Sequence, residues 1–398
     1  MERCVSAIGL VVLLAIAWLM SENRRRMNWR LIISGVSLQF VLAVFLLRTP
    51  IGQSIFDAAR GFVDRLVSFS DAGAEFVFGP NFRDHYLAFS VLPTIIFISS
   101  LTAIFFHLGV LQRVVKIMAW VMVRVMDTSG AESLSASADV YVGMTEAPLV
   151  IRPYLATMTR SELMAMMTTG MATVAGGVMA AYVRMGADAG HLLTASLLAA
   201  PASLVIAKIM VPETETSPTK GTVRVEITRT DVNVLDAACR GASDGLKLAL
   251  NVAAMMIAFY AIIHALNWML TPLPHVGGEP LTLERLLGWM LAPLAWVLGI
   301  EWKDAQVVGM LLGKKTVFNE FVAYQDLVTR QGLSDRSFTI ATYALCGFAN
   351  FASVAIMVGG IGSLEPSRRA ELARYGMRAM AGGALATLMT AAVAGTLL

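Results

Sequence analysis

The sequence is poor in the side chains from which metal centres, redox centres and hydrolytic active sites are usually built. Its three cysteines are far apart and form no CxxC pair, so neither a structural metal nor a redox role is expected for them. The five histidines are scattered and show no HExxH motif or paired spacing, which argues against a metalloenzyme. We therefore expect that the protein is not an enzyme and carries no cofactor.

Charge is also scarce, whereas apolar residues are abundant. Charged residues make up 15% of the chain and no basic cluster occurs, so we expect no nucleic-acid partner. Hydrophobic residues make up 57%, and the mean hydropathy is +0.67. Apolar runs of about 20 residues are typical of membrane helices. The composition therefore predicts an all-α polytopic membrane protein surrounded by a lipid bilayer.

The hydropathy pattern predicts about eight transmembrane helices, which are expected at residues 5–20, 31–47, 86–107, 161–182, 191–211, 246–270, 338–361 and 377–397. The arginine-rich link after the first span is expected in the cytoplasm, by the positive-inside rule. Amphipathic helices along the interface are expected at residues 51–72, 110–126 and 281–297. Residues 213–231 and 271–280 are expected to be loops outside the membrane.

Two stretches carry acidic and amide side chains among apolar neighbours. One contains Glu146 within residues 128–157, and the other contains Asn319 and Glu320 within residues 301–330. A charge at mid-membrane costs roughly 2.5–3.5 kcal/mol, so such residues usually face a protein interior or a watery cavity. We expect each stretch to be a re-entrant hairpin buried in protein. A simpler alternative is that Glu320 pairs with Lys315 and only stabilises a loop.

The order of these features repeats within the chain. Residues 110–211 and 282–397 each give an amphipathic helix, a polar hairpin, a glycine-rich broken span and a plain span. The span count places the two blocks in opposite orientations, which is typical of secondary transporters with a site between the repeats. We expect scaffold helices at 1–109, the first transport repeat at 110–212, a loop and scaffold helix at 213–281, and the second repeat at 282–398.

Three motifs carry a resemblance to a known family. They are the stretch from Gly313 through Asn319 and Glu320 to Tyr324, the stretch from Gly143 to Tyr154, and the stretch from Tyr343 to Ser353. In this order they resemble the concentrative nucleoside transporters, and the likeness runs from about residue 86 to the C-terminus. The resemblance implies a bacterial inner-membrane homotrimer that imports nucleosides by alternating access, driven by a sodium or proton gradient.

The resemblance also implies a substrate site. Glu320, Asn350 and Ser353 would hold the ribose, because carboxylates and amides bind paired hydroxyl groups. The base would be addressed by Met144, Thr145 and Glu146, whereas Phe348 and Val178 would supply apolar packing. For the last two residues, ordinary core packing is the alternative.

The chain departs from the family pattern at Met144, where members commonly have Gln. Methionine cannot bond a base edge strongly, and the loss of a polar contact can change selectivity greatly. We therefore expect a base preference that differs from that of the usual members. The runner-up interpretation is a proton-coupled carrier of a modified nucleoside or nucleobase. A channel is disfavoured, because it would need polar pore-lining rings without hairpin repeats.

The second departure is Asp139, where sodium-coupled members have Asn. The resemblance implies a sodium shell of Asp139, the Val142 carbonyl, Thr173 and Val174. A carboxylate could bind sodium there, because hard cations take oxygen ligands. It could equally carry a proton, because burial favours the neutral form of a carboxyl group, and the proton is the interpretation that we favour from the sequence. A third alternative is that Asp139 only caps the start of a helix.

Overall fold

The computed structural model describes residues 2–221, 231–273, 275–276, 278 and 280–398. Within these ranges the regular structure is helical, apart from isolated bridge residues such as the pair Ser129 and Lys220. The loops predicted at 213–231 and 271–280 lie partly outside the described residues. The first half of the chain forms α1 (Glu2–Leu19), α2 (Trp29–Arg48), α3 (Pro50–Phe78), η1 (Phe82–His85), η2 (Leu87–Val91), α4 (Leu92–His107), α5 (Val110–Met126), α6 (Gly130–Asp139), α7 (Ala147–Val150), η3 (Arg152–Thr157), α8 (Arg160–Ala172), α9 (Gly176–Met185) and α10 (Ala189–Met210).

The second half continues without strands in its described part. Asn233 caps the helix that follows the polar loop, because its side chain accepts a hydrogen bond from Asp236 N. The elements are α11 (Val234–Leu270), α12 (Leu283–Val297), α13 (Trp302–Val317), α14 (Glu320–Thr329), α15 (Asp335–Leu345), α16 (Phe351–Leu364), η4 (Pro366–Arg368) and α17 (Arg369–Leu397).

Among the described residues, seven helical segments are long and apolar enough to cross a membrane, or eight if α12 and α13, bent by 117°, are counted as one. The seven are Glu2–Leu19, Trp29–Arg48, Leu87–His107, Arg160–Met185, Ala189–Met210, Val234–Leu270 and Pro366–Leu397. They match seven predicted spans. The eighth, 338–361, is divided between α15 and α16, each of which is too short to cross alone.

Two predicted boundaries are wrong. The span expected at 246–270 begins twelve residues earlier, at Val234, because the Asn233 cap starts the helix before its charged first turns. The span expected at 377–397 begins at Arg369, so Arg369, Arg374 and Arg378 lie on α17 and not in a loop before it. In both cases the polar residues extend the helix beyond its apolar part.

The three predicted amphipathic stretches are helices: α3, α5 and α12. On α5, Val115, Ala119 and Met122 are buried, whereas Ile117 and Trp120 are exposed. This spacing puts the buried residues on one helix face. Each stretch therefore packs one side against the protein, as the pattern predicts.

Both predicted hairpins are helix–loop–helix units. The first consists of α6 and, after a loop, α7 and η3; the second consists of α13 and α14, with Phe318 and Asn319 between them. Both predicted broken spans are also interrupted: α8 ends at Ala172 and α9 begins at Gly176, whereas α15 ends at Leu345 and α16 begins at Phe351. The two repeats therefore have the same order of elements.

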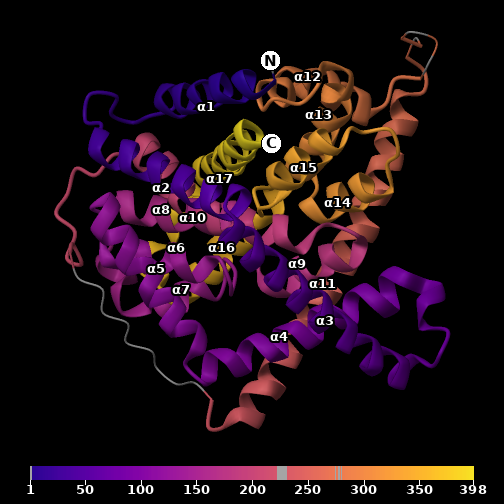
Figure 1. Ribbon diagram of the computed structural model, residues 1–398, viewed down its shortest axis with the longest axis horizontal. Coiled ribbons are helices and arrows are strands. Elements are labelled where there is room, and N and C mark those ends of the chain that lie inside the picture. Colours follow the sequence, from indigo (N-terminus) through magenta and orange to yellow (C-terminus); the bar gives the residue numbers. More distant parts are fainter. Residues whose placement is uncertain (1, 222–230, 274, 277, 279) are drawn as a thin grey trace.

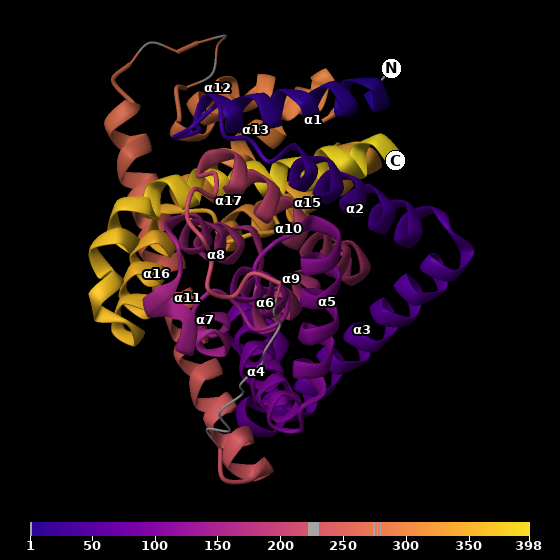
Figure 2. The same ribbon diagram turned by 90° about the vertical axis from the view of Figure 1, so that its left-hand side faces the viewer.

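Helix α17 lies in the middle of the fold, where it packs against α1, α8, α10, α15 and α16 (Figure 1). Small residues allow this close approach. A Cβ at Gly383 on α17 would lie 2.4 Å from the Met171 side chain of α8. Helices α1, α12 and α13 lie on one side of α17, at the end of the molecule where both termini are found (Figure 2).

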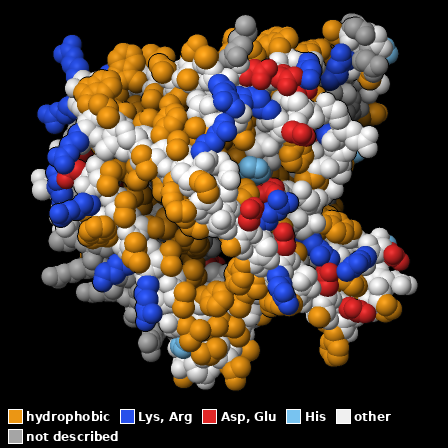
Figure 3. Space-filling model, in the orientation of Figure 1, with side chains coloured by type: hydrophobic (Ala, Val, Ile, Leu, Met, Phe, Trp, Pro, Cys, Tyr) orange, Lys and Arg blue, Asp and Glu red, His pale blue; other side chains and the backbone are white. Residues whose placement is uncertain are grey.

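Large apolar side chains remain exposed on the outside of the bundle. Ile257 and Trp268 on α11 are 75% and 76% exposed although they belong to an apolar helix. Figure 3 shows hydrophobic side chains over much of one face. Lys and Arg side chains follow its left edge, and a band of charged side chains runs from the upper centre to the lower right. A soluble monomer rarely exposes apolar patches of this extent, whereas a lipid-facing surface requires them.

Candidate functional site

The buried carboxylate of Glu320 is the centre of the site. Its Oε1 accepts a hydrogen bond from the Tyr182 hydroxyl at 2.9 Å, and its Oε2 accepts one from Asn350 Nδ2 at 2.9 Å. Glu320 begins α14, Tyr182 lies on α9, and Asn350 directly precedes α16. Hairpin 2 and the two broken spans therefore all contribute to the site. Glu320 and Asn350 are 5% and 2% exposed. This arrangement makes the predicted contact of hairpin 2 with the second broken span.

The orientation of the Asn350 amide follows from its place at a helix start. Asn350 precedes α16, and its Oδ1 accepts a hydrogen bond from Ser353 N at 2.9 Å. With the oxygen used as the cap, only the NH₂ group remains to face Glu320. Asn319 caps α14 in the same way, because its Oδ1 accepts from Val322 N at 2.9 Å.

The alternative pairing of Glu320 with Lys315 is not observed. Lys315 Nζ instead donates to the Ala344 carbonyl at 2.9 Å and to Thr387 Oγ1 at 3.0 Å. Tyr182 was not among the predicted site residues. It lies on the second half of a predicted broken span and is fully buried. A buried tyrosine hydroxyl needs a hydrogen-bond partner, so a tyrosine at this place in the sequence is the signal that could have indicated a site residue.

Phe348 and Val178 lie where apolar packing was predicted. Val178 is 2% exposed in the main hydrophobic core, and Phe348 is partly buried against the same core. The Phe348 N–H also donates to the Thr173 carbonyl at 3.3 Å, which joins the two helix breaks. The structure is consistent with both the packing role and the ordinary core alternative for these side chains.

The tip of hairpin 1 lies beside the middle of α16. A Cβ at Gly170 would lie 2.8 Å from both Met144 Cβ and Met357 Cε, and a Cβ at Gly360 would lie 3.5 Å from the methyl group of Thr145. Thr145 and Glu146 are exposed. Among the described residues, no hydrogen bond or ion pair joins Glu146 to Glu320, so the predicted base-binding and ribose-binding residues form two groups.

The predicted cation-site residues lie close together. Asp139 is the last residue of α6, which packs against α8, and the loop after it contacts the break between α8 and α9. Tyr141 O accepts a hydrogen bond from Gly176 N at 3.0 Å. Gly143 has φ +96°, and a Cβ there would lie 2.8 Å from Ala175 Cβ. These contacts bring the loop that holds Val142 against Thr173 and Val174.

Asp139 is 1% exposed, and neither of its carboxylate oxygens has a hydrogen-bond partner among the described residues. The Ser135 hydroxyl, one turn earlier, lies close enough to interact but not at hydrogen-bonding geometry. The cap alternative is wrong, because Asp139 ends α6 and does not begin a helix. A buried carboxylate without donors fits a bound cation or a proton.

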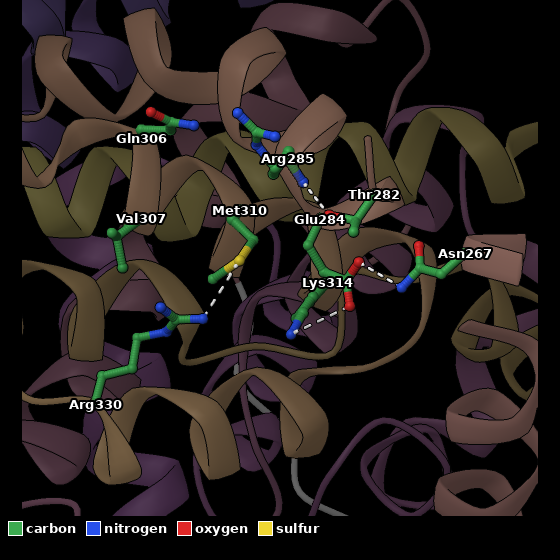
Figure 4. Close-up of a pocket in the computed structure, with 9 residues that line it drawn as sticks. All are labelled: Asn267, Thr282, Glu284, Arg285, Gln306, Val307, Met310, Lys314 and Arg330. Atoms are coloured by element: carbon green, nitrogen blue, oxygen red, sulfur yellow. Dashed lines mark hydrogen bonds and ion pairs between the residues drawn. The ribbon is translucent and has the colours of Figure 1, made fainter. Parts of the chain in front are cut away.

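A separate cavity of about 410 Å³ lies on the other side of hairpin 2, and none of the predicted site residues lines it (Figure 4). Lys314 Nζ donates to Asp326 at 2.8 Å and lies 4.0 Å from Glu284. Asn267 of α11 donates to Glu284 at 2.9 Å. The neighbouring residues Lys314 and Lys315 therefore contact different parts of the structure.

Sequence comparison matches most of the chain to three family descriptions. Residues 191–395 match the Na⁺ dependent nucleoside transporter C-terminus, and residues 8–81 match the N-terminus of the same family. Residues 88–189 match a domain described as nucleoside recognition, or gate. The matched segments include both hairpins and both helix breaks.

Individual relatives agree with this assignment. The chain is 39% identical to rat solute carrier family 28 member 3 over 415 residues, which is 100% of this chain but 59% of the relative. The chain thus spans about three fifths of that relative's length. It is 41% identical to the uncharacterized transporter YutK of Bacillus subtilis, over 98% of both chains.

Solved structures give the same result. CNTnw in an inward-facing, substrate-bound state matches with a TM-score of 0.92 and 39% identity, over 100% of this chain and 98% of that chain. A CNTnw variant in an outward-facing state matches with a TM-score of 0.94 over the same shares of both chains. The resemblance seen in the sequence motifs is confirmed. The chain belongs to the Na⁺ dependent nucleoside transporter family.

Proposed function

We propose that the protein is a secondary active symporter that imports nucleosides, driven by a cation gradient. The observation that carries this proposal is the buried Glu320 carboxylate, which is held by Tyr182 and Asn350 at the meeting point of two broken spans and a hairpin. A nucleoside is neutral and rich in hydroxyl donors, and a carboxylate accepts from two of them. The named relatives, which include sodium/nucleoside cotransporter 1 of the rat, support this substrate class.

In this account the ribose hydroxyls bind at Glu320, Asn350 and Ser353, and the base extends toward Met144, Thr145 and Glu146. Ser353 is 3% exposed and lies in the first turn of α16, next to the Asn350 cap. Because the hairpin-1 tip lies farther along α16, the substrate would bridge the two groups. Val178 and Phe348 would pack against the bound nucleoside.

Sodium is the coupling ion that we propose first. The family descriptions name sodium, and the Asp139, Val142, Thr173 and Val174 group offers oxygen ligands at a helix break. A proton is the second candidate, because both Asp139 oxygens lack a hydrogen-bond partner. The corresponding alternative function is a proton-coupled carrier of a modified nucleoside or nucleobase.

Alternating access would move the two repeats, 110–212 and 282–398, together with α1 and α2. The scaffold would then consist of the helices of 1–109 that follow α2, and of residues 213–281. The tight packing of α4 on α11 supports a fixed unit made of these two helices. The packing of α1 on α17, and of α2 on α10, supports movement of α1 and α2 with the repeats and not with the scaffold. We further propose a homotrimer in the inner membrane of a bacterium, in keeping with the bacterial relatives.

The test is uptake of radiolabelled uridine into proteoliposomes under an imposed sodium gradient or an imposed proton gradient. The proposal expects accumulation above equilibrium with sodium and little with protons alone. Accumulation with protons alone would support the second candidate. If neither gradient drives uptake of uridine or of competing purine nucleosides, the nucleoside assignment is overturned.

A further inference from the structure

Lys315 is a buried cation that the proposed substrate and cation sites do not include. It is 2% exposed and lies in the last turn of α13. Its two hydrogen bonds, to the Ala344 carbonyl on α15 and to Thr387 Oγ1 on α17, hold three elements together. Burying a charge is costly, so the position requires an explanation beyond packing.

The acceptor at Ala344 gives that explanation. Helix α15 ends at Leu345, directly before the break, so the carbonyls of its last turn carry the negative end of the helix dipole. Hairpin 2 supplies donors to two of them. The Tyr324 hydroxyl donates to the Thr342 carbonyl at 2.6 Å, and the Lys315 ammonium donates to the Ala344 carbonyl.

The first repeat has the opposite chemistry at the matching place. Asp139 is the last residue of α6, and Lys315 lies in the last turn of α13. Helix α6 packs on α8, the first half of its broken span, and Lys315 bonds to the end of α15, the first half of the other. The Ser135 hydroxyl, one turn before Asp139 on α6, also lacks a hydrogen-bond partner in the described part of the chain. Repeat 1 therefore presents oxygen atoms that need a cation, whereas repeat 2 already contains one.

We infer that Lys315 is a positioning residue: a tethered ammonium that takes, in the second repeat, the place that the coupling cation takes in the first. This inference rests on the proposed cation-coupled transport. The ammonium fixes the end of α15, and the break that follows leads within five residues to the Asn350 cap. Lys315 thereby keeps Asn350 and Glu320 in position to bind substrate without an ion in the second repeat. The coupling ion then binds only in the first repeat.

The experiment compares the wild-type protein with Lys315→Met in proteoliposomes, where uridine uptake is measured against uridine and sodium concentrations. Loss of a charged hydrogen-bonding group is expected to raise KM by about tenfold or more, because Asn350 and Glu320 lose their register. The matched control is Lys314→Met, which removes the adjacent lysine on the pocket side and should leave KM within about twofold. A Lys315→Met protein with lower maximal rate but wild-type KM would overturn the inference.

A second measurement keeps the inference testable if the Lys315→Met protein does not fold into the membrane or shows no uptake. Thr387→Val keeps the ammonium and removes one acceptor with almost no change of shape, and it should raise KM in the same direction by a smaller factor. An unchanged KM in Thr387→Val, together with inactive Lys315→Met, would contradict the positioning role.

Thermal unfolding of purified protein separates a cation role from simple packing and needs no transport. Lys315→Ala should unfold at a lower temperature than the wild type in choline chloride. Sodium chloride should restore more of this loss than it adds to the wild type, because the shortened side chain leaves room for a free ion. An equal loss in both salts would overturn the cation role. If the wild-type protein takes up no nucleoside, the proposed function fails, whereas this salt comparison still decides the role of Lys315.

Discussion

The Asn350 side chain makes two hydrogen bonds. Its Oδ1 accepts from Ser353 N and so caps α16, and its Nδ2 donates to Glu320 Oε2 at 2.9 Å. The start of α16 and the carboxylate that we propose to bind substrate are thus fixed by one amide. A change to aspartate should separate the two roles, because an ionised carboxylate can cap a helix but cannot donate to Glu320.

Asn350→Asp should preserve the fold and weaken substrate binding. Aspartate caps helices as well as asparagine, but it places a second carboxylate beside Glu320 in a buried site. We expect KM for uridine to rise by about tenfold or more. The control is Asn28→Asp, which makes the same change at the cap of α2, where Asn28 Oδ1 accepts from Leu31 N at 3.1 Å. Equal KM values for both variants would contradict the role of Asn350.

Tyr182→Phe should affect the substrate site without disturbing its aromatic packing. The Tyr182 ring stacks on Tyr324 with centroids 4.3 Å apart, and the variant keeps this contact while it removes the donor to Glu320. A hydrogen bond to a charged group contributes about 1.5–3 kcal/mol, so we expect a clear rise in KM and a lower unfolding temperature. Tyr343→Phe, whose hydroxyl contacts His191 at 3.1 Å, should lower stability only. Uptake kinetics and thermal unfolding of both variants check this prediction.

Met144→Gln should change which nucleosides are transported. Met144 packs beside Gly170 and Met357, so a glutamine of similar length would place a polar amide at the proposed base site. Polar recognition of one substrate group can change selectivity by orders of magnitude. We expect the ratio of purine to pyrimidine uptake to change by about tenfold. An unaltered ratio in competition assays would remove Met144 from the selectivity argument.

Asp139→Asn should distinguish the two coupling ions. If sodium is coupled, the neutral amide still offers an oxygen ligand but loses the charge attraction, and the half-activating sodium concentration should rise by about tenfold. If a proton is coupled, the variant should lose gradient-driven accumulation, because an amide cannot carry the proton. Counterflow exchange of labelled uridine serves as the control, since it needs no net ion movement. Wild-type sodium activation in Asp139→Asn would exclude Asp139 from the cation site.

The sequence predicted the elements well because hydropathy and helix-breaking residues act locally. Both hairpins and both breaks were located from polar and glycine-rich positions such as Glu320 and Gly176. The start of α11 was missed because charged residues such as Arg240 continue the helix beyond its apolar part. The site partners Tyr182 and Thr387 could not be predicted, because each comes from a helix far away in sequence, and tertiary packing alone decides which side chains meet.

Uridine uptake by Glu320→Gln tests the central claim most directly, because the change keeps the size of the side chain and removes only its charge. Sodium-driven uptake of radiolabelled uridine should be measured in proteoliposomes that contain equal amounts of wild-type and variant protein. The account predicts that Glu320→Gln raises KM by at least about tenfold, since ribose hydroxyls lose a charged acceptor. Wild-type KM and maximal rate in Glu320→Gln would contradict the claim that this carboxylate binds the nucleoside.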